Sequence, residues 1–286
     1  MADAKTLKSK LASGDFDARL KEVYLSDKAV ADQKERDAVI IDEFVKLFGD
    51  SDSIELFSAP GRTEVGGNHT DHNHGKVLAA GVDLDTVAAA AKRGDNIIVE
   101  KSFKFDALEV DITDLDVHKE EFGKSSGLIR GICAGFVSRG YKIGGFNAAS
   151  MSRVLSGSGL SSSAAYEVLI ATILNHLYND GSISDVEIAK IAQFAENKYF
   201  GKPCGLLDQM TSSVGGFITI DFEDPSKPII NKVDFDFASC GHALCIVDTG
   251  GNHADLTDDY ASIRKEMESA AEVFGKSESW AKVTFY

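Results

Sequence analysis

The feature that most constrains the fold is a helical pattern at residues 164–177 that is apolar nearly all round. Its apolar positions are Ala164, Ala165, Val168, Leu169, Ile170, Ile173, Leu174 and Leu177. A helix with so little polar face is buried in a core, so other elements must surround it. The chain has 286 residues and is 43% hydrophobic, which is enough for such a core in one large domain or two ordinary ones.

Helices and strands are mixed along the rest of the chain. Apolar spacing predicts helices at residues 34–48 and 258–274, and a Ser184–Glu187 capping box starts a helix that runs to about Tyr199. The segments with the composition of strands are 54–59, 96–101, 144–155, 215–222 and 242–249, and 77–91 fits a strand or a buried helix. This mixture indicates an α/β or α+β fold.

The composition argues against several classes of partner and location. A net charge of −15 repels phosphate backbones and anionic lipid, so we expect neither a nucleic-acid nor a membrane partner. We find no secretory leader pattern and no apolar run of membrane-spanning length. The four cysteines, Cys133, Cys204, Cys240 and Cys245, form no Cys-x-x-Cys pair, which fits a soluble protein of the reducing cytoplasm. The oligomeric state stays open.

A glycine-serine stretch, SGSGLSSSAA at residues 156–165, opens the apolar helix. Glycines let the backbone approach a ligand, and the first amides of a helix attract anions, so this stretch predicts a phosphate site. It lacks the Gly-Lys-Ser/Thr of a P-loop and the third glycine of the dinucleotide fingerprint. The alternative is a flexible turn before a helix, but three serines at one helix end favour ligand binding.

A second unusual stretch, APGRTEVGGNHTDHNHG at residues 59–75, follows a predicted strand. It is compatible with a metal site, a polar loop or one wall of a substrate pocket. His69 and His72 have a spacing that could serve zinc on a helix, but the stretch is rich in glycine and lacks the His-Glu-x-x-His frame. We therefore interpret His72 and His74 as polar loop residues.

These stretches together resemble a known family. Gly-x-Gly-Leu-Ser-Ser-Ser-Ala-Ala resembles the ATP-phosphate motif of the GHMP small-molecule kinases, and residues 59–75 resemble the galactokinase signature APGRVNLIGEHTDYNGG. Ala195-Glu196 with PCGLLDQ at 203–209, and Asp259-Tyr260, are similar to further galactokinase segments in the family order. The resemblance implies a two-domain α+β GHMP kinase fold. Residues 1–203 would form the S5-like sugar- and ATP-binding domain, and 204–286 the start of a truncated C-terminal GHMP domain.

The resemblance also implies a reaction and its residues. The reaction is transfer of phosphate from MgATP to the anomeric hydroxyl of galactose, with ATP and Mg²⁺ as cofactors. The implied catalytic residues are Asp208, as the group that holds the hydroxyl, and Arg62, as the cation beside it. The implied sugar-binding residues are Asn68, His69, Asp71 and Tyr260, and the implied metal ligands are Ser162, Ser163 and Glu196. The implied ATP-phosphate loop is Gly157, Ser158, Gly159, Leu160, Ser161, Ser162 and Ser163. Without the resemblance, Arg62 would be expected on the surface and Glu196 on a solvated helix face.

The chain departs from the family pattern in the stretch at 59–75, where Thr63, Glu64 and His72 also replace the usual residues, and towards its end. Asn68 stands where the family has a sugar-contacting glutamate, so a kinase for N-acetylgalactosamine or galacturonate is an alternative to galactose. A non-catalytic sugar and ATP sensor on the same fold is another. The family's third glycine-rich motif, roughly Gly-x-Gly-x-Gly-Gly, does not occur before Tyr286. We therefore expect an N-terminal fragment or shortened form that is inactive, or nearly so, alone.

Overall fold

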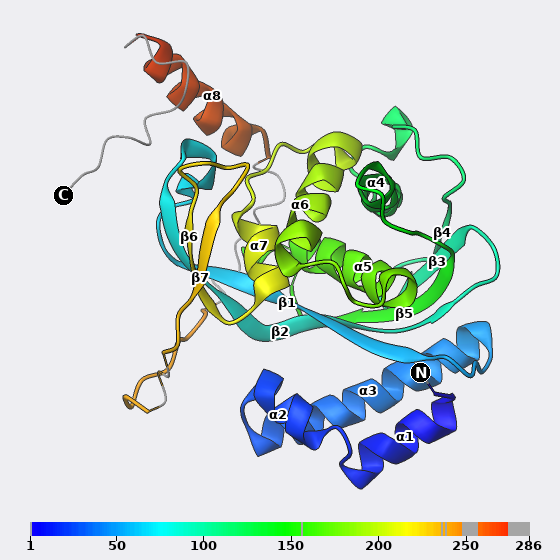
Figure 1. Cartoon of the computed structure of the whole chain (residues 1–286). Coiled ribbons are helices and arrows are strands. Elements are labelled where there is room, and N and C mark those ends of the chain that lie inside the picture. Colours follow the sequence, from blue (N-terminus) through cyan, green and yellow to red (C-terminus); the bar gives the residue numbers. More distant parts are fainter. Residues whose placement is uncertain (1, 156, 236, 238, 248–256, 274–286) are drawn as a thin grey trace.

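The computed structural model describes residues 2–155, 157–235, 237, 239–247 and 257–273. Its centre is a seven-stranded sheet with helices on both faces (Figure 1). The helices are α1 (Ala4–Ser13), α2 (Asp17–Tyr24), α3 (Asp27–Phe48), α4 (Ser125–Ser138), α5 (Ser162–Asn179), α6 (Asp185–Ala195), α7 (Leu207–Val214) and α8 (Thr257–Val273). The strands are β1 (Glu55–Gly66), β2 (Lys76–Lys92), β3 (Ile97–Ser102), β4 (Leu108–Asp111), β5 (Phe146–Ser152), β6 (Phe217–Asp221) and β7 (Ile229–Lys232).

The sheet is organised around the 17-residue strand β2. The strand order is β4-β3-β5-β2-β6-β7, and β1 pairs with β2 along its other edge. All pairings are antiparallel except that of β3 with β5. The mixed, largely antiparallel sheet with helices packed on it confirms the α+β prediction.

Residues 77–91, which fitted a strand or a buried helix, form most of β2. Ala88 and Ala90 face the core beneath α5, whereas Val87, Ala89 and Ala91 face the core formed with α1 and α3. Both sets are apolar because both faces of this strand are covered, so the sequence shows no polar alternation. The small alanine side chains fit between the two helical layers.

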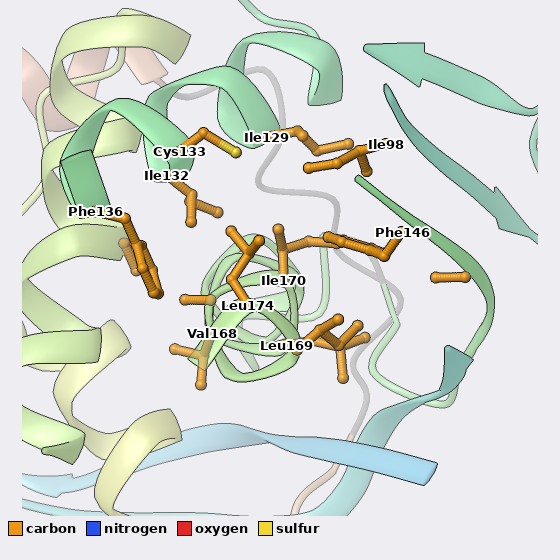
Figure 2. Packing of buried hydrophobic residues seen from close by; sticks show 14 of the residues in the cluster. Ile98, Ile129, Ile132, Cys133, Phe136, Phe146, Val168, Leu169, Ile170 and Leu174 are labelled. Atoms are coloured by element: carbon orange, nitrogen blue, oxygen red, sulfur yellow. The ribbon is translucent and has the colours of Figure 1, made fainter. Parts of the chain in front are cut away.

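The predicted apolar helix is α5, and it is buried as expected. Leu169, Ile170, Ile173 and Leu174 have no exposed surface, and α5 packs against α4, α6, α7 and the sheet. Figure 2 shows α5 residues interleaved with Ile132, Phe136 and Phe146 from α4 and β5. Burial of one such side chain contributes about 1.5–3 kcal/mol, so this cluster is a main source of stability.

Other local predictions have mixed outcomes. The Ser184 hydroxyl accepts from the Glu187 amide at 3.3 Å, which confirms the cap of α6. The helix changes after Ala195 to a π-turn (Glu196–Phe200), and α8 confirms the last predicted helix as far as the described residues extend. The strand predicted at 242–249 is wrong for residues 242–247, which are exposed and pair with no described strand; 248–249 lie outside the described residues. The sequence patterns missed α1, α2, α4 and α7.

The helical layer of α1–α3 is joined to the sheet by a buried ion pair. Arg36 of α3 donates to both a side-chain oxygen and the backbone carbonyl of Asp85 in β2. Tyr24 and Ser58 donate to the other Asp85 oxygen, each at 2.5 Å. Each buried charge therefore has partners, as burial in a low-dielectric interior requires.

The sheet continues beyond the boundary expected at residues 203/204. Strand β6 pairs with residues 76–80 of β2, and β7 pairs with β6. Helix α7 packs on β1 and β2. Residues 207–232 therefore belong to the same sheet, and to the helices packed on it, as the residues before Cys204. No helix in the part of the chain that the structure describes has the length and apolarity needed to cross a bilayer.

Candidate active site

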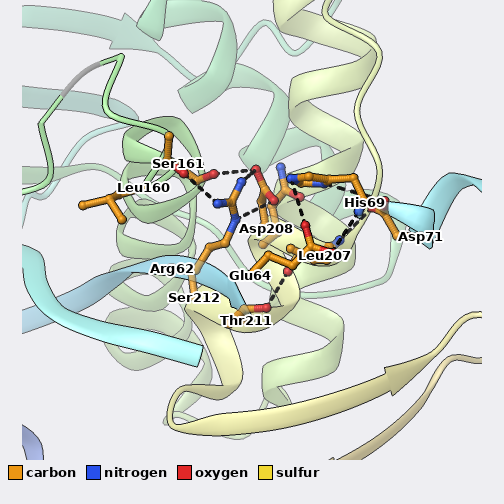
Figure 3. Close-up of polar contacts among 12 residues, drawn as sticks. Arg62, Glu64, His69, Asp71, Leu160, Ser161, Leu207, Asp208, Thr211 and Ser212 are labelled. Atoms are coloured by element: carbon orange, nitrogen blue, oxygen red, sulfur yellow. Dashed lines mark hydrogen bonds and ion pairs between the residues drawn. The ribbon is translucent and has the colours of Figure 1, made fainter. Parts of the chain in front are cut away.

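An arginine-aspartate pair lies where β1, α5 and α7 meet (Figure 3). Arg62 Nε and Nη2 donate to the two carboxylate oxygens of Asp208, each at 2.7 Å. The third nitrogen, Nη1, donates to the Gly159 carbonyl at 2.7 Å. This planar, two-pronged geometry is the strong form of a charged hydrogen bond. The Arg62 side chain is 8% exposed, so it is not a surface arginine.

The glycine-serine loop is fixed to the same pair. The Arg62 amide donates to the Leu160 carbonyl at 3.0 Å, and the Ser161 hydroxyl donates to Asp208. A Cβ on Gly61 would lie 2.9 Å from the Leu160 oxygen, so this approach of β1 to the loop requires glycine. The family resemblance implied Arg62, Leu160, Ser161 and Asp208 as site residues, and the structure brings them together.

The beginning of α5 keeps the features of an anion site. Ser161 has φ 57° and ψ 61°, and no side chain caps the helix. The first amides of a helix have no acceptor within it and carry partial positive charge. Ser162 and Ser163 occupy this first turn and are partly buried. The arrangement can therefore receive phosphate oxygens through amides and hydroxyls.

The Asp208 carboxylate is held ionised. Burial raises its pKa, but the Arg62 charge and the hydrogen bonds from Arg62 and Ser161 outweigh burial, so the pKa lies below the ordinary value. An ionised carboxylate accepts hydrogen bonds through both oxygens, but one with a low pKa is a weak base. Asp208 is therefore suited to orienting a hydroxyl more than to removing its proton early.

The loop after β1 presents a second carboxylate. Asp71 is 5% exposed, and the Leu207 amide at the start of α7 donates to it at 3.1 Å. A Cβ on Gly205 would lie 1.7 Å from Asp71 Oδ2, so only glycine allows the backbone to run this close to the carboxylate. The contact links the loop to the same helix that carries Asp208.

Asn68 and His69 form the exposed part of this loop. Both have left-handed backbones, with φ 53° and 51°, and the His69 amide donates to Glu64 Oε1 at 2.9 Å. The His69 ring lies 3.9 Å from Asp71 Oδ1 and 3.7 Å from Glu64 Oε2. The interaction with Asp71 raises the pKa of His69, although burial opposes the change. Glu64, which the sequence analysis did not single out, therefore shapes the loop.

Glu196 lies in a buried polar cluster behind Asp208 and not on a solvated face. It is 2% exposed, and the Gln209 side-chain amide donates to its Oε2 at 2.6 Å and to Glu167 at 3.1 Å. Lys202 Nζ lies 3.2 Å from Glu196 Oε1. Sequence reasoning missed Glu167, Gln209 and Lys202. One signal was available: Glu167 is a charge inside an otherwise apolar helix pattern.

Two predictions concern residues that the structure describes incompletely. Tyr260 lies in α8, but its side chain is outside the description, so its contact with a sugar stays a prediction. The His72 side chain is likewise not described. Among the residues that are described, no group of three or more histidine, cysteine or acidic side chains is placed to hold a metal ion.

Comparison with known proteins agrees with this geometry. A family profile described as the galactokinase galactose-binding signature matches residues 42–92, and the GHMP kinases N-terminal domain matches 127–216. Galactokinase of Clostridium tetani is 31% identical over 237 residues, covering 82% of this chain and 59% of the relative. Galactokinase of Streptomyces coelicolor is 32% identical over 237 residues, covering 82% and 60%. The chain therefore spans about three fifths of the length of these relatives.

Solved structures give the same result. The crystal structure of Lactococcus lactis galactokinase complexed with galactose matches with a TM-score of 0.68 and 25% identity, covering 84% of this chain and 61% of that one. Mevalonate kinase of Methanococcus jannaschii shares the fold, with a TM-score of 0.54 and 17% identity, covering 65% of this chain and 58% of its own. Fold and sequence matches thus place the chain in the GHMP kinase superfamily. Within that class, the chain belongs to the galactokinase family.

Proposed function

We propose that the protein transfers the γ-phosphoryl group of ATP to the anomeric hydroxyl of galactose, giving galactose 1-phosphate. The observation that carries the proposal is the Arg62–Asp208 pair, held at 2.7 Å between the glycine-serine loop and α7. This pair puts a hydroxyl acceptor and a fixed positive charge at the opening of an anion-binding helix. Phosphoryl transfer needs mainly such positioning and charge stabilisation.

In the proposed step, Asp208 accepts a hydrogen bond from the anomeric hydroxyl and orients its oxygen. The oxygen forms a bond to the γ-phosphorus while the bond from phosphorus to the β,γ-bridging oxygen breaks. The hydroxyl proton passes to Asp208 late, because the low pKa of this carboxylate makes it a weak base. Arg62 stabilises the negative charge on the transferred group, and ADP leaves.

We propose that the loop after β1 recognises the sugar. Asp71 can accept from two adjacent hydroxyls, which distinguishes stereoisomers, and His69 and Asn68 lie at the exposed side of the same loop. Galactose is the first choice because of the complex of the Lactococcus lactis relative. Asn68 in place of the family glutamate keeps N-acetylgalactosamine and galacturonate as second candidates.

We propose that residues 157–163 bind the ATP phosphates, and that Mg²⁺ arrives with ATP. When bound there, Mg²⁺ would neutralise negative charge on the ATP phosphates. The Ser162 and Ser163 hydroxyls are available to hold it. Lys202 and Gln209 occupy the two oxygens of Glu196, so Mg²⁺ would bind this carboxylate directly only if one of these donors moved away. We also propose a cytoplasmic location, which fits an ATP-dependent sugar kinase with unpaired cysteines.

We propose that a second structural unit begins after Lys232, where the last strand of the sheet, β7, ends.

An ATP-coupled turnover assay with galactose, N-acetylgalactosamine, galacturonate and glucose tests the proposal. Galactose-dependent turnover should fall by about 10²-fold or more in Asp208→Asn. Asp52→Asn, an exposed carboxylate in the turn before β1, is the matched control and should keep wild-type turnover. If another sugar of the panel gives faster turnover than galactose, that sugar replaces galactose as the proposed substrate. The assay is run on this chain and on a form extended past Tyr286, because this chain alone is expected to be inactive or nearly so. Calorimetric binding of sugar and ATP without turnover in the extended form would reject catalysis and favour a sensor.

A further inference from the structure

The polar cluster behind Asp208 joins three helical segments. Its members are Glu167 of α5, Glu196 at the end of α6, Gln209 of α7 and Lys202 in the connection before α7. Glu167 and Gln209 have no exposed surface, and the Glu196 side chain is 3% exposed. Lys202 differs from the others because 41% of its side chain is exposed. A long lysine stem can keep its charge near a buried partner while part of it remains in water.

The contacts leave neither oxygen of Glu196 unoccupied. Lys202 Nζ donates to Oε1 at 3.2 Å, and the Gln209 amide donates to Oε2 at 2.6 Å. The same Gln209 nitrogen donates to Glu167 at 3.1 Å, so it holds the two carboxylates in fixed positions. A divalent ion that binds Glu196 directly would have to displace one of these donors.

The charges of the cluster point to Lys202 as the compensating cation. Burial and the nearby Glu196 raise the pKa of Glu167 well above its usual value, which favours its neutral form. Within the cluster, Lys202 is the one positive group beside the Glu196 carboxylate, and a buried carboxylate needs such a partner.

We propose that Lys202 is a tethered cation that occupies the Glu196 carboxylate and competes there with a divalent cation. Both positive charges favour the same oxygens, and like charges within a few ångströms repel strongly in a poorly solvated site. Lys202 is the exposed, flexible member, so it can withdraw when a cation enters with nucleotide. Lys202 thus acts as a positioning residue through Glu196. The role of the cation in turnover rests on the proposed kinase function, whereas the competition does not.

Binding of Mn²⁺ alone, followed by the electron paramagnetic resonance signal of the free ion, tests this directly. Lys202→Met should bind Mn²⁺ at least about tenfold more tightly than the wild type, because a competing charge is removed. Lys202→Arg keeps the charge and should behave like the wild type. Lys198→Met removes a charge from the adjoining π-turn, where Lys198 lies over the Phe194 ring, and should also leave Mn²⁺ binding unchanged.

Two further variants make the result decisive. Glu196→Gln combined with Lys202→Met should abolish the gained affinity, which locates the ion. Lys202→Gln keeps a hydrogen-bond donor for Glu196 and replaces the Met variant if that variant does not fold. A folded Lys202→Met or Lys202→Gln that binds Mn²⁺ no tighter than the wild type would overturn the proposal. Because the assay contains neither sugar nor ATP, a failure of the kinase proposal leaves this result interpretable.

Discussion

Gly205→Ala is the substitution that most directly tests the proposal that the Asp71 carboxylate binds the sugar. A Cβ at this position would lie 1.7 Å from Asp71 Oδ2 and 2.4 Å from its Cγ. Packed atoms do not approach closer than about 3 Å, so the Asp71 carboxylate must move by more than about 1 Å. The backbone of Gly205 does not have positive φ, so alanine introduces the clash without left-handed strain.

The displacement should break the hydrogen bond from the Leu207 amide to Asp71, which is 3.1 Å long. A hydrogen bond to a charged group contributes about 1.5–3 kcal/mol, which corresponds to about 10–150-fold in an equilibrium constant. If Asp71 recognises the sugar, galactose affinity should therefore fall by about 10–100-fold. Overpacking should also cost about 1–3 kcal/mol of folding free energy.

Isothermal titration with galactose measures the affinity, and thermal unfolding measures the stability. Gly66→Ala is the matched control: it lies at the end of β1 near the same loop, and a Cβ there meets nothing within 4 Å. It should bind galactose as the wild type does. Wild-type affinity in a folded Gly205→Ala protein would refute the assignment of Asp71. Equal losses in both variants would show that the loop responds to any substitution.

Three further predictions concern stability. Burial raises the pKa of Asp37 from 3.8 to about 6, so the folded state binds its proton more tightly and stability falls as pH rises through this range. In urea titrations, the free energy of unfolding of Asp37→Asn, relative to that of the wild type, should rise by about 3 kcal/mol from pH 4 to pH 7. A difference between the two proteins that does not change with pH would contradict this. Arg36→Met leaves Asp85 buried without its cation and should lose about 3–5 kcal/mol, and a loss below about 1 would disprove the pairing. Gly131→Ala places a Cβ 2.8 Å from the Tyr199 side chain and should lower the melting temperature, whereas Gly94→Ala, with open space, should not.

The sequence predicted the parts of the site that lie in short motifs. The glycine-serine stretch and the apolar pattern after it were sufficient to predict α5, and the anion site at its beginning stays a prediction. The family resemblance brought Arg62 and Asp208 into one hypothesis, and the structure joins their side chains. These features were predictable because each depends on residue types at close spacing, or on a motif that carries its own context.

Features that depend on partners distant in sequence could not be predicted. Nothing in residues 77–91 states that helices cover both faces of β2, so strand and helix remained open. Helix α4 was missed because its glycines lower helix propensity, yet Gly131 and Gly135 allow the helix to approach α6 closely. Lys202 was missed because no pattern in its neighbourhood shows that Glu196 is buried.

The side-chain hydrogen bonds of Arg62 have a consequence for folding during synthesis. They join this residue to Gly159, 97 positions later, and to Asp208, 146 positions later. During synthesis, the Arg62–Asp208 pair cannot form until α7 has left the ribosome and docked, although α1–α3 and β1 were completed long before. Contacts of such long sequence separation form late, since closing the intervening chain costs entropy. Recovery of ligand binding after refolding should therefore lag behind helix content and mark the last step of assembly.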